Sequence, residues 1–290
     1  MKKVSFVQSN NQRHWVGNGF PVRSVFSYND RAAEFSPFLL LDYAGPATFE
    51  PTTERKGVGE HPHRGFETVT IVYDGEVEHR DSTGGGGIIG PGDVQWMTAA
   101  GGLVHEEFHG PNFAKTGGAF EMAQLWVNLP AKHKLAEPGY QGIANAQIPH
   151  VELPDGAGSL RVIAGDYNGT RGAARTFSPV NVWDVTLKAG SRATFRVPDG
   201  YTTAVFVMRG GIAIADGKTV GEADIAVLER SGDEFEIEAT ADTKLLILNG
   251  EPFAEPVVGY GPFVMNSRRE IEQAITDFQN GKMGRIAVHV

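Results

Sequence analysis

The chain has 290 residues, 41% of them hydrophobic and 21% charged, which is enough apolar material for one large or two ordinary globular domains. Its formal net charge is −9 and its lysines and arginines are scattered, which argues against direct nucleic-acid binding. The chain has no cysteine, which excludes disulfides, thiolate nucleophiles and cysteine-based zinc sites. We find neither a membrane-spanning apolar run nor a signal peptide, and therefore expect a cytoplasmic protein.

Short strands separated by turns are predicted in the first half of the chain. Thr68–Tyr73 is rich in β-branched residues, and the Asp74-Gly75 pair after it is a turn signal. Turn signals recur about every eight to twelve residues, which favours an all-β barrel or sandwich over a parallel sheet. The further strands that we expect here are Glu76–Arg80, Ile88–Ile89, Val94–Met97 and Gln124–Asn128.

The second half of the chain repeats this rhythm of short strands and glycine-containing turns, which suggests a two-barrel repeat. The strands predicted there are Val182–Leu187, Ala193–Val197, Thr203–Met208, Ile212–Ala215, Ile225–Leu228 and Lys244–Leu248. A stretch rich in glycine and proline separates the halves. We therefore expect an N-terminal barrel (residues 1–135), a linker (136–158), and a C-terminal barrel with a helix (159–290).

One helix is predicted near the C-terminus. Ser267 followed three residues later by Glu270 fits a capping box, and Gly281 is a suitable stop. Between them an apolar stripe with helical spacing is formed by Ile271, Ala274, Ile275 and Phe278. We expect this stripe to pack against a barrel.

The histidines are concentrated in the first half of the chain, and none lies between His150 and His289. His61 and His63 are two residues apart, as are His105 and Glu107. Residues two apart on a strand share a face, so each pair would point inward while Glu106 would point away. Two neighbouring strands of this kind would make a site of three nitrogens and one oxygen.

Neutral imidazoles with one carboxylate and open positions suit a divalent non-haem iron, and manganese, copper, nickel or zinc are also compatible. Because the second half offers no imidazole before His289, the site would belong to the N-terminal barrel. Either pair alone is more often a surface or hydrogen-bonded arrangement than a metal site. It is their combination, across strand–turn–strand patterning, that favours a metal.

Other candidate residues have simpler interpretations. We expect His79 to be structural or exposed, whereas His109 could share the face of Glu107 near a cavity mouth. The glycines at 84–87 are not followed by Lys-Ser/Thr, so they predict a hairpin and not a phosphate loop. Some aromatic and apolar residues would line the cavity if a flat aromatic ligand binds there, but a core role is favoured for Phe66, Trp96, Met97 and Trp126.

Several segments together resemble the pirin family. The first-domain segments are HPHRGFETVT (61–70), PGDVQWMTA (91–99), HEE (105–107) and QLWVNLP (124–130). The resemblance extends upstream to PFLLLD (37–42) and downstream to GYGPFVMN (259–266) and the helix after it, so it covers nearly the whole chain.

The resemblance implies two cupin barrels that face each other. It implies one Fe²⁺ in the N-terminal barrel, bound at the positions of His61, His63, His105 and Glu107, and a C-terminal barrel that has lost its ligands. In the general cupin pattern a glutamate at the position of Glu67 can be a ligand. We follow the pirin pattern and treat Glu67 as a structural residue or one that supports the ligands.

The resemblance also implies two alternative functions. The first is a quercetin 2,3-dioxygenase, in which a flavonol 3-hydroxyl binds the metal, Glu107 takes its proton, and O₂ opens the ring with release of carbon monoxide. The second is a metal-dependent regulatory protein that binds transcription factors or metabolic enzymes without turnover. Open coordination positions favour the enzyme. The sequence names neither a physiological substrate, nor a protein partner, nor an oligomeric state.

Overall fold

The structure is a computed structural model that describes residues 1–214 and 217–287. The chain forms two compact units. The unit that we call the His-rich unit consists of Gln12–Ala32, Phe38–Asn145 and Ala254–Val290. The other, which we call the His-poor unit because His150 is its one histidine, consists of Met1–Asn11, Ala33–Pro37 and Ala146–Phe253.

The division of the chain differs from the expected chain order at both ends. Strand β1 (Val4–Ser9) belongs to the His-poor unit, where it pairs with β22 (Asp224–Leu228). The C-terminal residues 254–290 belong to the His-rich unit. The expected linker is also partly strand: β12 (Gly139–Ile143) and β13 (His150–Glu152) join the edges of two different sheets. Local strand signals do not reveal which sheet edge a segment joins, so sequence patterning could not locate these pairings.

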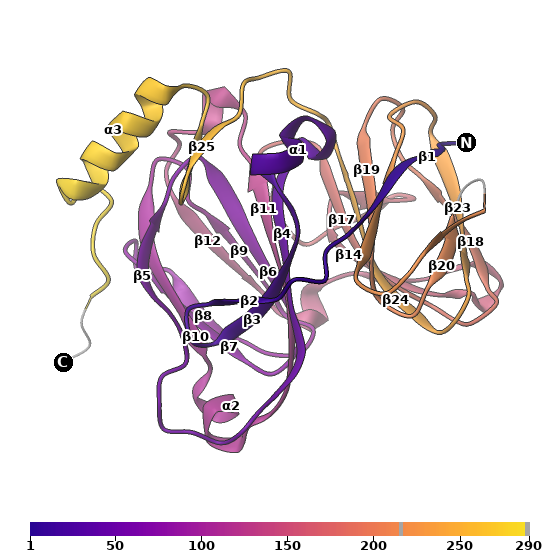
Figure 1. The fold of residues 1–290 in the computed structure, drawn as a ribbon, viewed down its shortest axis with the longest axis horizontal. Helices are drawn as coiled ribbons and strands as arrows, with labels where there is room; N and C mark the ends of the chain where they lie inside the picture. Colours follow the sequence, from indigo (N-terminus) through magenta and orange to yellow (C-terminus); the bar gives the residue numbers. More distant parts are fainter. Residues whose placement is uncertain (215–216, 288–290) are drawn as a thin grey trace. The chain divides into compact units, whose positions relative to one another are not determined.

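The His-rich unit consists of two packed sheets (Figure 1). The seven-stranded sheet has the order β12-β9-β6-β11-β4-β3-β2, with β2 (His14–Val16), β3 (Phe20–Ser27), β4 (Phe38–Phe49), β6 (Phe66–Asp74), β9 (Val94–Thr98) and β11 (Gly118–Asn128). The four-stranded sheet has the order β5-β10-β7-β8, with β5 (Gly57–His63), β7 (Val77–Asp81), β8 (Gly86–Ile89) and β10 (Leu103–His109). Val72, Met122, Val77 and Ile89 from both sheets form one buried cluster.

The His-poor unit repeats this plan. Its seven-stranded sheet has the order β1-β22-β19-β24-β17-β14-β13, with β14 (Gly158–Ala164), β17 (Val180–Leu187), β19 (Thr202–Arg209) and β24 (Thr243–Gly250). Its four-stranded sheet has the order β18-β23-β20-β21, with β18 (Arg192–Arg196), β20 (Ile212–Ile214), β21 (Lys218–Val220) and β23 (Glu234–Ala239). A small hairpin, β15 (Asp166–Tyr167) and β16 (Thr170–Arg171), lies beside them. Trp183, Phe195 and Phe235 belong to a core that contains residues of both sheets.

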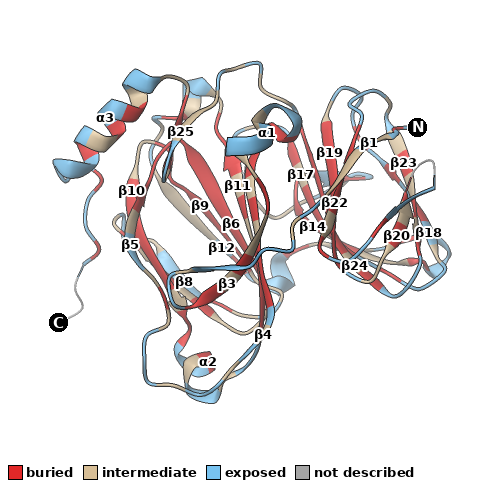
Figure 2. Ribbon diagram, in the orientation of Figure 1, coloured by how far each residue is buried: buried red, intermediate tan, exposed pale blue. Residues whose placement is uncertain are grey.

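The eleven strands predicted from sequence all coincide with observed strands, and each unit has the two-layered architecture expected for a jelly roll. The sheets pack face to face without closing into a continuous barrel. The strand predicted at 212–215 is observed as β20 over Ile212–Ile214, and residue 215 lies outside the described residues. Burial follows the strands, whose inner faces are apolar while most turns are exposed (Figure 2).

The predicted C-terminal helix is confirmed as α3 (Arg268–Gln279). Ser267 caps it by accepting the Glu270 N–H at 3.3 Å, and Gly281 follows it with φ +72°. Its stripe packs on β25 (Val258–Tyr260) and β26 (Phe263–Met265) in the His-rich unit.

Helices α1 (Tyr28–Phe35) and α2 (Pro111–Thr116) were not predicted, nor were three single-turn 3₁₀ segments at Ala131–His133, Asn145–Gln147 and Pro154–Gly156. These elements are too short for a periodic apolar stripe to identify them. No helix among the described residues has the length and apolar character needed to cross a membrane.

Candidate metal centre

Strands β5 and β10 bring the two predicted ligand pairs together. They are antiparallel neighbours, with His61 opposite His105. Towards the other end of the pair Glu107 lies opposite Val58, so β5 contains one extra residue, a bulge, between Val58 and His61. Since the bulge lies outside the His61–His63 pair, both histidines keep the same face, as the two-residue spacing predicted.

Three of the four predicted ligands converge. One ring nitrogen from each of His61, His63 and His105 lies within 4.8 Å of the others, which is close enough for one ion to reach all three. The ring centroids are 4.8 Å apart for His61 and His63, 4.2 Å for His61 and His105, and 4.8 Å for His63 and His105. His63 and His105 are buried, whereas His61 is half-buried and forms the more accessible side of the cluster.

Hydrogen bonds determine which ring nitrogen two of these histidines offer. His61 Nδ1 lies 2.8 Å from the Gly59 carbonyl oxygen, and His63 Nδ1 lies 3.3 Å from the Pro262 carbonyl oxygen. A carbonyl can only accept, so each Nδ1 carries the proton and each Nε2 keeps its lone pair. The Nε2 of His105 is buried and has no hydrogen-bond partner among the described residues. Such a donor set fits a divalent transition metal.

The C-terminal segment positions the Pro262 carbonyl. The Arg64 side chain, beside His63, donates to Asp277 of α3 at 2.9 Å and to the Gly101 carbonyl at 2.7 Å. Val264 N donates to the Arg64 carbonyl at 3.1 Å. The buried Arg64–Asp277 ion pair thereby fixes α3 and the strand before it next to β5, where the carbonyl meets His63.

Buried Lys134 makes a second tie to this segment. Its Nζ donates to the carbonyl oxygens of Gly65 and Val264 and to Asn128 Oδ1, at 2.7 to 2.9 Å. Burial lowers the pKa of Lys134 to about 7. Three acceptors surround Nζ, so the role of this buried side chain is structural.

The environment keeps two of the clustered imidazoles, those of His63 and His105, neutral. Burial lowers the pKa of His63 and of His105 well below 6.5, and the neighbouring imidazoles lower it further. A metal binds the neutral form of the ring, so this environment favours ligation near neutral pH.

Glu107 adjoins the cluster through His105. Its carboxylate forms a second potential ligand group with His79 and His105, within 4.8 Å of one another, and this group does not include His61 or His63. Oε1 accepts from Gln95 at 2.8 Å and Oε2 accepts from Gln124 at 3.0 Å. Both oxygens are therefore held in place by amide donors.

Glu106 has a different role from its neighbour. It pairs with Arg80 and with Arg55, the latter at 3.3 Å, on the other side of β10 from the imidazoles. Glu106 meets arginines whereas Glu107 lies beside His105, so the two side chains point to opposite faces of β10, as predicted. Residue spacing gave no sign that Glu106 is largely buried and carries ion pairs of its own.

His79 and Tyr140 are parts of the site that were not predicted from the sequence. His79 is fully buried, and its Nδ1 lies 3.3 Å from His105 Nδ1. Tyr140 stacks on His79, with ring centroids 5.1 Å apart and planes 14° apart, and its hydroxyl donates to Gln95 Oε1 at 3.3 Å. Burial, Glu107 and Asp81 together raise the pKa of Tyr140 to about 12, so its hydroxyl stays protonated.

Glu67 and His109, which were also considered for a functional role, both have surroundings that indicate a structural one. Glu67 belongs to neither potential ligand group and accepts from Thr98 Oγ1 at 2.7 Å, while burial raises its pKa to about 7. His109 hydrogen-bonds to the Gly19 carbonyl oxygen at 2.9 Å and packs among Phe20, Phe49, Phe113 and Phe120.

Aromatic residues border the cluster at His63. Phe66 and Trp126 are stacked with centroids 4.2 Å apart, and both pack against the His63 ring. Trp126 is half-buried, whereas Phe66, Trp96 and Met97 are fully buried as predicted for core residues. The predicted hairpin at residues 84–87 connects β7 and β8.

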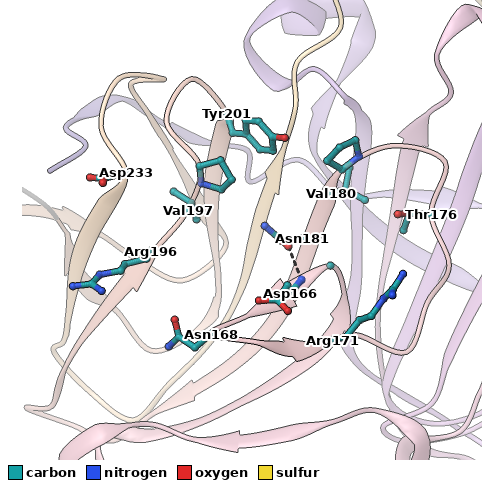
Figure 3. A pocket seen from close by; sticks show the side chains of 13 residues that line it. Asp166, Asn168, Arg171, Thr176, Val180, Asn181, Arg196, Val197, Tyr201 and Asp233 are labelled. Carbon is teal, nitrogen blue, oxygen red and sulfur yellow. Dashed lines mark hydrogen bonds between the residues drawn. The ribbon is translucent and has the colours of Figure 1, made fainter.

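A separate cavity of about 740 Å³ lies in the His-poor unit (Figure 3). Its charged side chains include Asp166, Arg171, Arg196 and Asp233, and the two arginines do not converge on a common point (Figure 3). Arg196 pairs with Glu234 at 3.5 Å. Among the described residues, both potential metal-binding groups lie in the His-rich unit, as the distribution of histidines predicted.

Comparison with known families identifies two domains in the chain. Residues 19–127 match the family model for Pirin, and residues 182–284 match that for the Pirin C-terminal cupin domain. The chain belongs to the pirin family. The predicted fold of two cupin domains is thereby confirmed for this pirin, as is the resemblance on which the prediction drew.

Relatives and solved structures support the same assignment. A protein of Pseudomonas aeruginosa named "Putative quercetin 2,3-dioxygenase" is 60% identical over 98% of this pirin and 99% of its own length. The crystal structure of a quercetin 2,3-dioxygenase from Acinetobacter baumannii matches with a TM-score of 0.97 and 55% identity, covering 99% of this chain and 100% of that one. A bacterial pirin of Escherichia coli in complex with nickel(II) shares the fold at 19% identity and a TM-score of 0.65, over 86% and 99% of the two chains.

Proposed function

We propose that this pirin is a metal-dependent dioxygenase that cleaves flavonols of the quercetin type. The observation that carries the proposal is the convergence of three imidazoles, with the Nε2 atoms of His61 and His63 freed by carbonyl acceptors on Nδ1. His61, His63 and His105 would hold the ion, and Glu107 would supply the carboxylate. Fe²⁺ is our first choice, and the same donors accept other divalent ions such as nickel.

A bound divalent ion would lower the pKa of a flavonol 3-hydroxyl and activate its anion towards O₂, with ring opening and loss of carbon monoxide. Glu107 is proposed to accept the hydroxyl proton. The amides of Gln95 and Gln124 hold its two oxygens, so the acceptor keeps a fixed position while its charge changes.

The aromatic residues beside His63 suit a flat substrate. Trp126 stacks on Phe66 and on Tyr28, with centroid distances of 4.2 and 6.4 Å and interplanar angles of 25° and 20°. Such a stack offers a planar apolar wall next to the imidazoles. We infer that the rings of the flavonol lie against the accessible side of Trp126.

Oxygen uptake by the iron-loaded protein tests the proposal. Quercetin should consume about one O₂ per molecule, whereas a flavone without the 3-hydroxyl should consume none, because it offers no group to deprotonate. Stoichiometric iron without uptake on any flavonol would refute the dioxygenase assignment. That result would favour the alternative, a metal-dependent binding protein that regulates a partner.

A further inference from the structure

His105 differs from the other two clustered histidines in what lies behind it. His61 and His63 each donate Nδ1–H to a backbone carbonyl, which fixes their tautomers. His105 Nδ1 instead lies 3.3 Å from Nδ1 of His79. A neutral imidazole can donate or accept at Nδ1, so this contact alone does not determine which nitrogen of His105 is free.

The far side of His79 resolves the ambiguity. His79 Nε2 lies 3.3 Å from Asp81 Oδ2, and an ionised carboxylate only accepts, so Nε2 of His79 must carry its proton. In the neutral ring of His79, Nδ1 is then an acceptor, which agrees with the second donor near it, Gln95 Nε2 at 3.4 Å. His105 must therefore donate from Nδ1, which leaves the lone pair on Nε2, the buried atom without a partner among the described residues.

We propose that Asp81 is a positioning residue for the metal centre: through His79 it fixes the tautomer of His105 that directs Nε2 at His61 and His63. The inference rests on the proposed function for the identity of the centre, since it concerns how one proposed ligand is prepared. Its ligand class is a divalent transition metal.

Asp81 is itself held rigidly. Its Oδ1 accepts from Thr83 N at 2.8 Å, Thr83 Oγ1 at 2.6 Å and Gly85 N at 3.0 Å, in the turn between β7 and β8. This leaves Oδ2 for His79. Pairing of β7 with β10 places Asp81 opposite His105 and His79 opposite Glu107, so the relay is built into the register of two neighbouring strands.

The same network argues against a second ion between His79, His105 and Glu107. The Gln95 amide nitrogen donates to Glu107 at 2.8 Å and approaches His79 Nδ1, so a neutral donor already occupies the space between these two groups. Tyr140 donates to Gln95 Oε1, which keeps the amide in this orientation. The network therefore favours a metal at the Nε2 side of His105.

Asp81→Asn tests the proposal in the full chain. Asparagine retains Oδ1 for the turn but presents an amide N–H₂ to His79, which must then accept at Nε2 and carry its proton on Nδ1. Two Nδ1–H groups cannot face each other, so His105 should move its proton to Nε2. Long-range ¹H–¹⁵N NMR on metal-free protein reads the tautomer directly. Zn²⁺ affinity, measured by competition with a chelator, should fall about 10- to 100-fold.

Asp93→Asn is the matched control, because Asp93 also accepts two backbone N–H groups, from Gly90 and Asn145, and has no hydrogen bond to a histidine among the described residues. It should leave the tautomer and the Zn²⁺ affinity unchanged. A second variant, His79→Gln, should lower the affinity as Asp81→Asn does, and the double variant should lose no more, since both interrupt one relay. Additive losses would overturn the proposal.

Unchanged His105 ¹⁵N shifts in Asp81→Asn would also overturn it. The NMR measurement uses neither metal nor flavonol, so failure of the proposed function can be distinguished from failure of this inference. If only the proposed function fails, quercetin is not consumed, but Asp81→Asn still changes the His105 tautomer.

Discussion

Two adjacent glutamates provide the sharpest test of the proposed ligand set. Glu107→Gln and Glu106→Gln are isosteric changes at neighbouring positions of β10, and both remove one buried negative charge. In Glu107→Gln one of the two amides now bonded to the carboxylate, Gln95 or Gln124, loses this acceptor and keeps only longer contacts, such as that to Thr70 Oγ1 at 3.5 or 3.4 Å. An unsatisfied buried donor costs about 1–3 kcal/mol.

Glu106→Gln removes two partly exposed ion pairs, since the side chains of Arg55 and Arg80 are 53% and 30% exposed. Pairs of this kind contribute up to about 1 kcal/mol each, so the loss should be up to about 2 kcal/mol. The metal-free variants should therefore unfold at similarly reduced temperatures. Stability alone does not separate them.

Metal content does separate them. Glu107→Gln should lose most of its iron and all flavonol turnover, because the amide neither neutralises the ion nor accepts the proton. Glu106→Gln should keep both, because its side chain meets arginines on the other face of β10. Elemental analysis and calorimetry on the two proteins, prepared in parallel, decide the matter. An empty site in Glu106→Gln with normal loading in Glu107→Gln would refute the assigned face of β10 and the ligand set with it.

Two further predictions concern the whole site and the core beside it. Combined replacement of His61, His63 and His105 by alanine should abolish transition-metal binding by the full chain, because both potential ligand groups contain at least one of them; stoichiometric iron in that variant would locate the site elsewhere. Glu67 has a folded-state pKa of about 7 against an ordinary value of 4.5, so the folded state binds the extra proton and stability should fall as pH rises from about 4.5 to 7. Glu67→Gln should remove this dependence and be more stable by up to about 3 kcal/mol at pH 8, whereas exposed Glu272→Gln should leave the pH profile unchanged.

Strand composition and spacing were sufficient to predict much of this molecule. The β-branched runs and glycine turns located eleven strands because each signal is local, and the capping box located α3 for the same reason. The spacing of two residues predicted that His61 and His63 share a face. It could not predict that Glu107 and His79 form a second potential ligand group with His105, because that depends on the pairing of β7 with β10.

His79 shows what the spacing rule could still have revealed. We expected it to be structural or exposed, and it is fully buried beside His105. His79 and Asp81 are two residues apart, as are His105 and Glu107, so the same rule puts both on one face. Tyr140 carried no comparable signal, because its strand of five residues lies within the stretch predicted as a linker.

The supporting groups behind the three imidazoles differ in how visible they are to sequence reasoning. The Gly59 carbonyl that holds His61 comes from the bulge in β5, and the Pro262 carbonyl that holds His63 comes from a segment about two hundred residues away in the chain. Any residue type supplies a carbonyl, so neither acceptor has a signature. Asp81 is the one of these three acceptors that belongs to a side chain, and its carboxylate holds His79 as a donor. Of the three supports, it is therefore the one whose chemistry a single isosteric substitution can reverse.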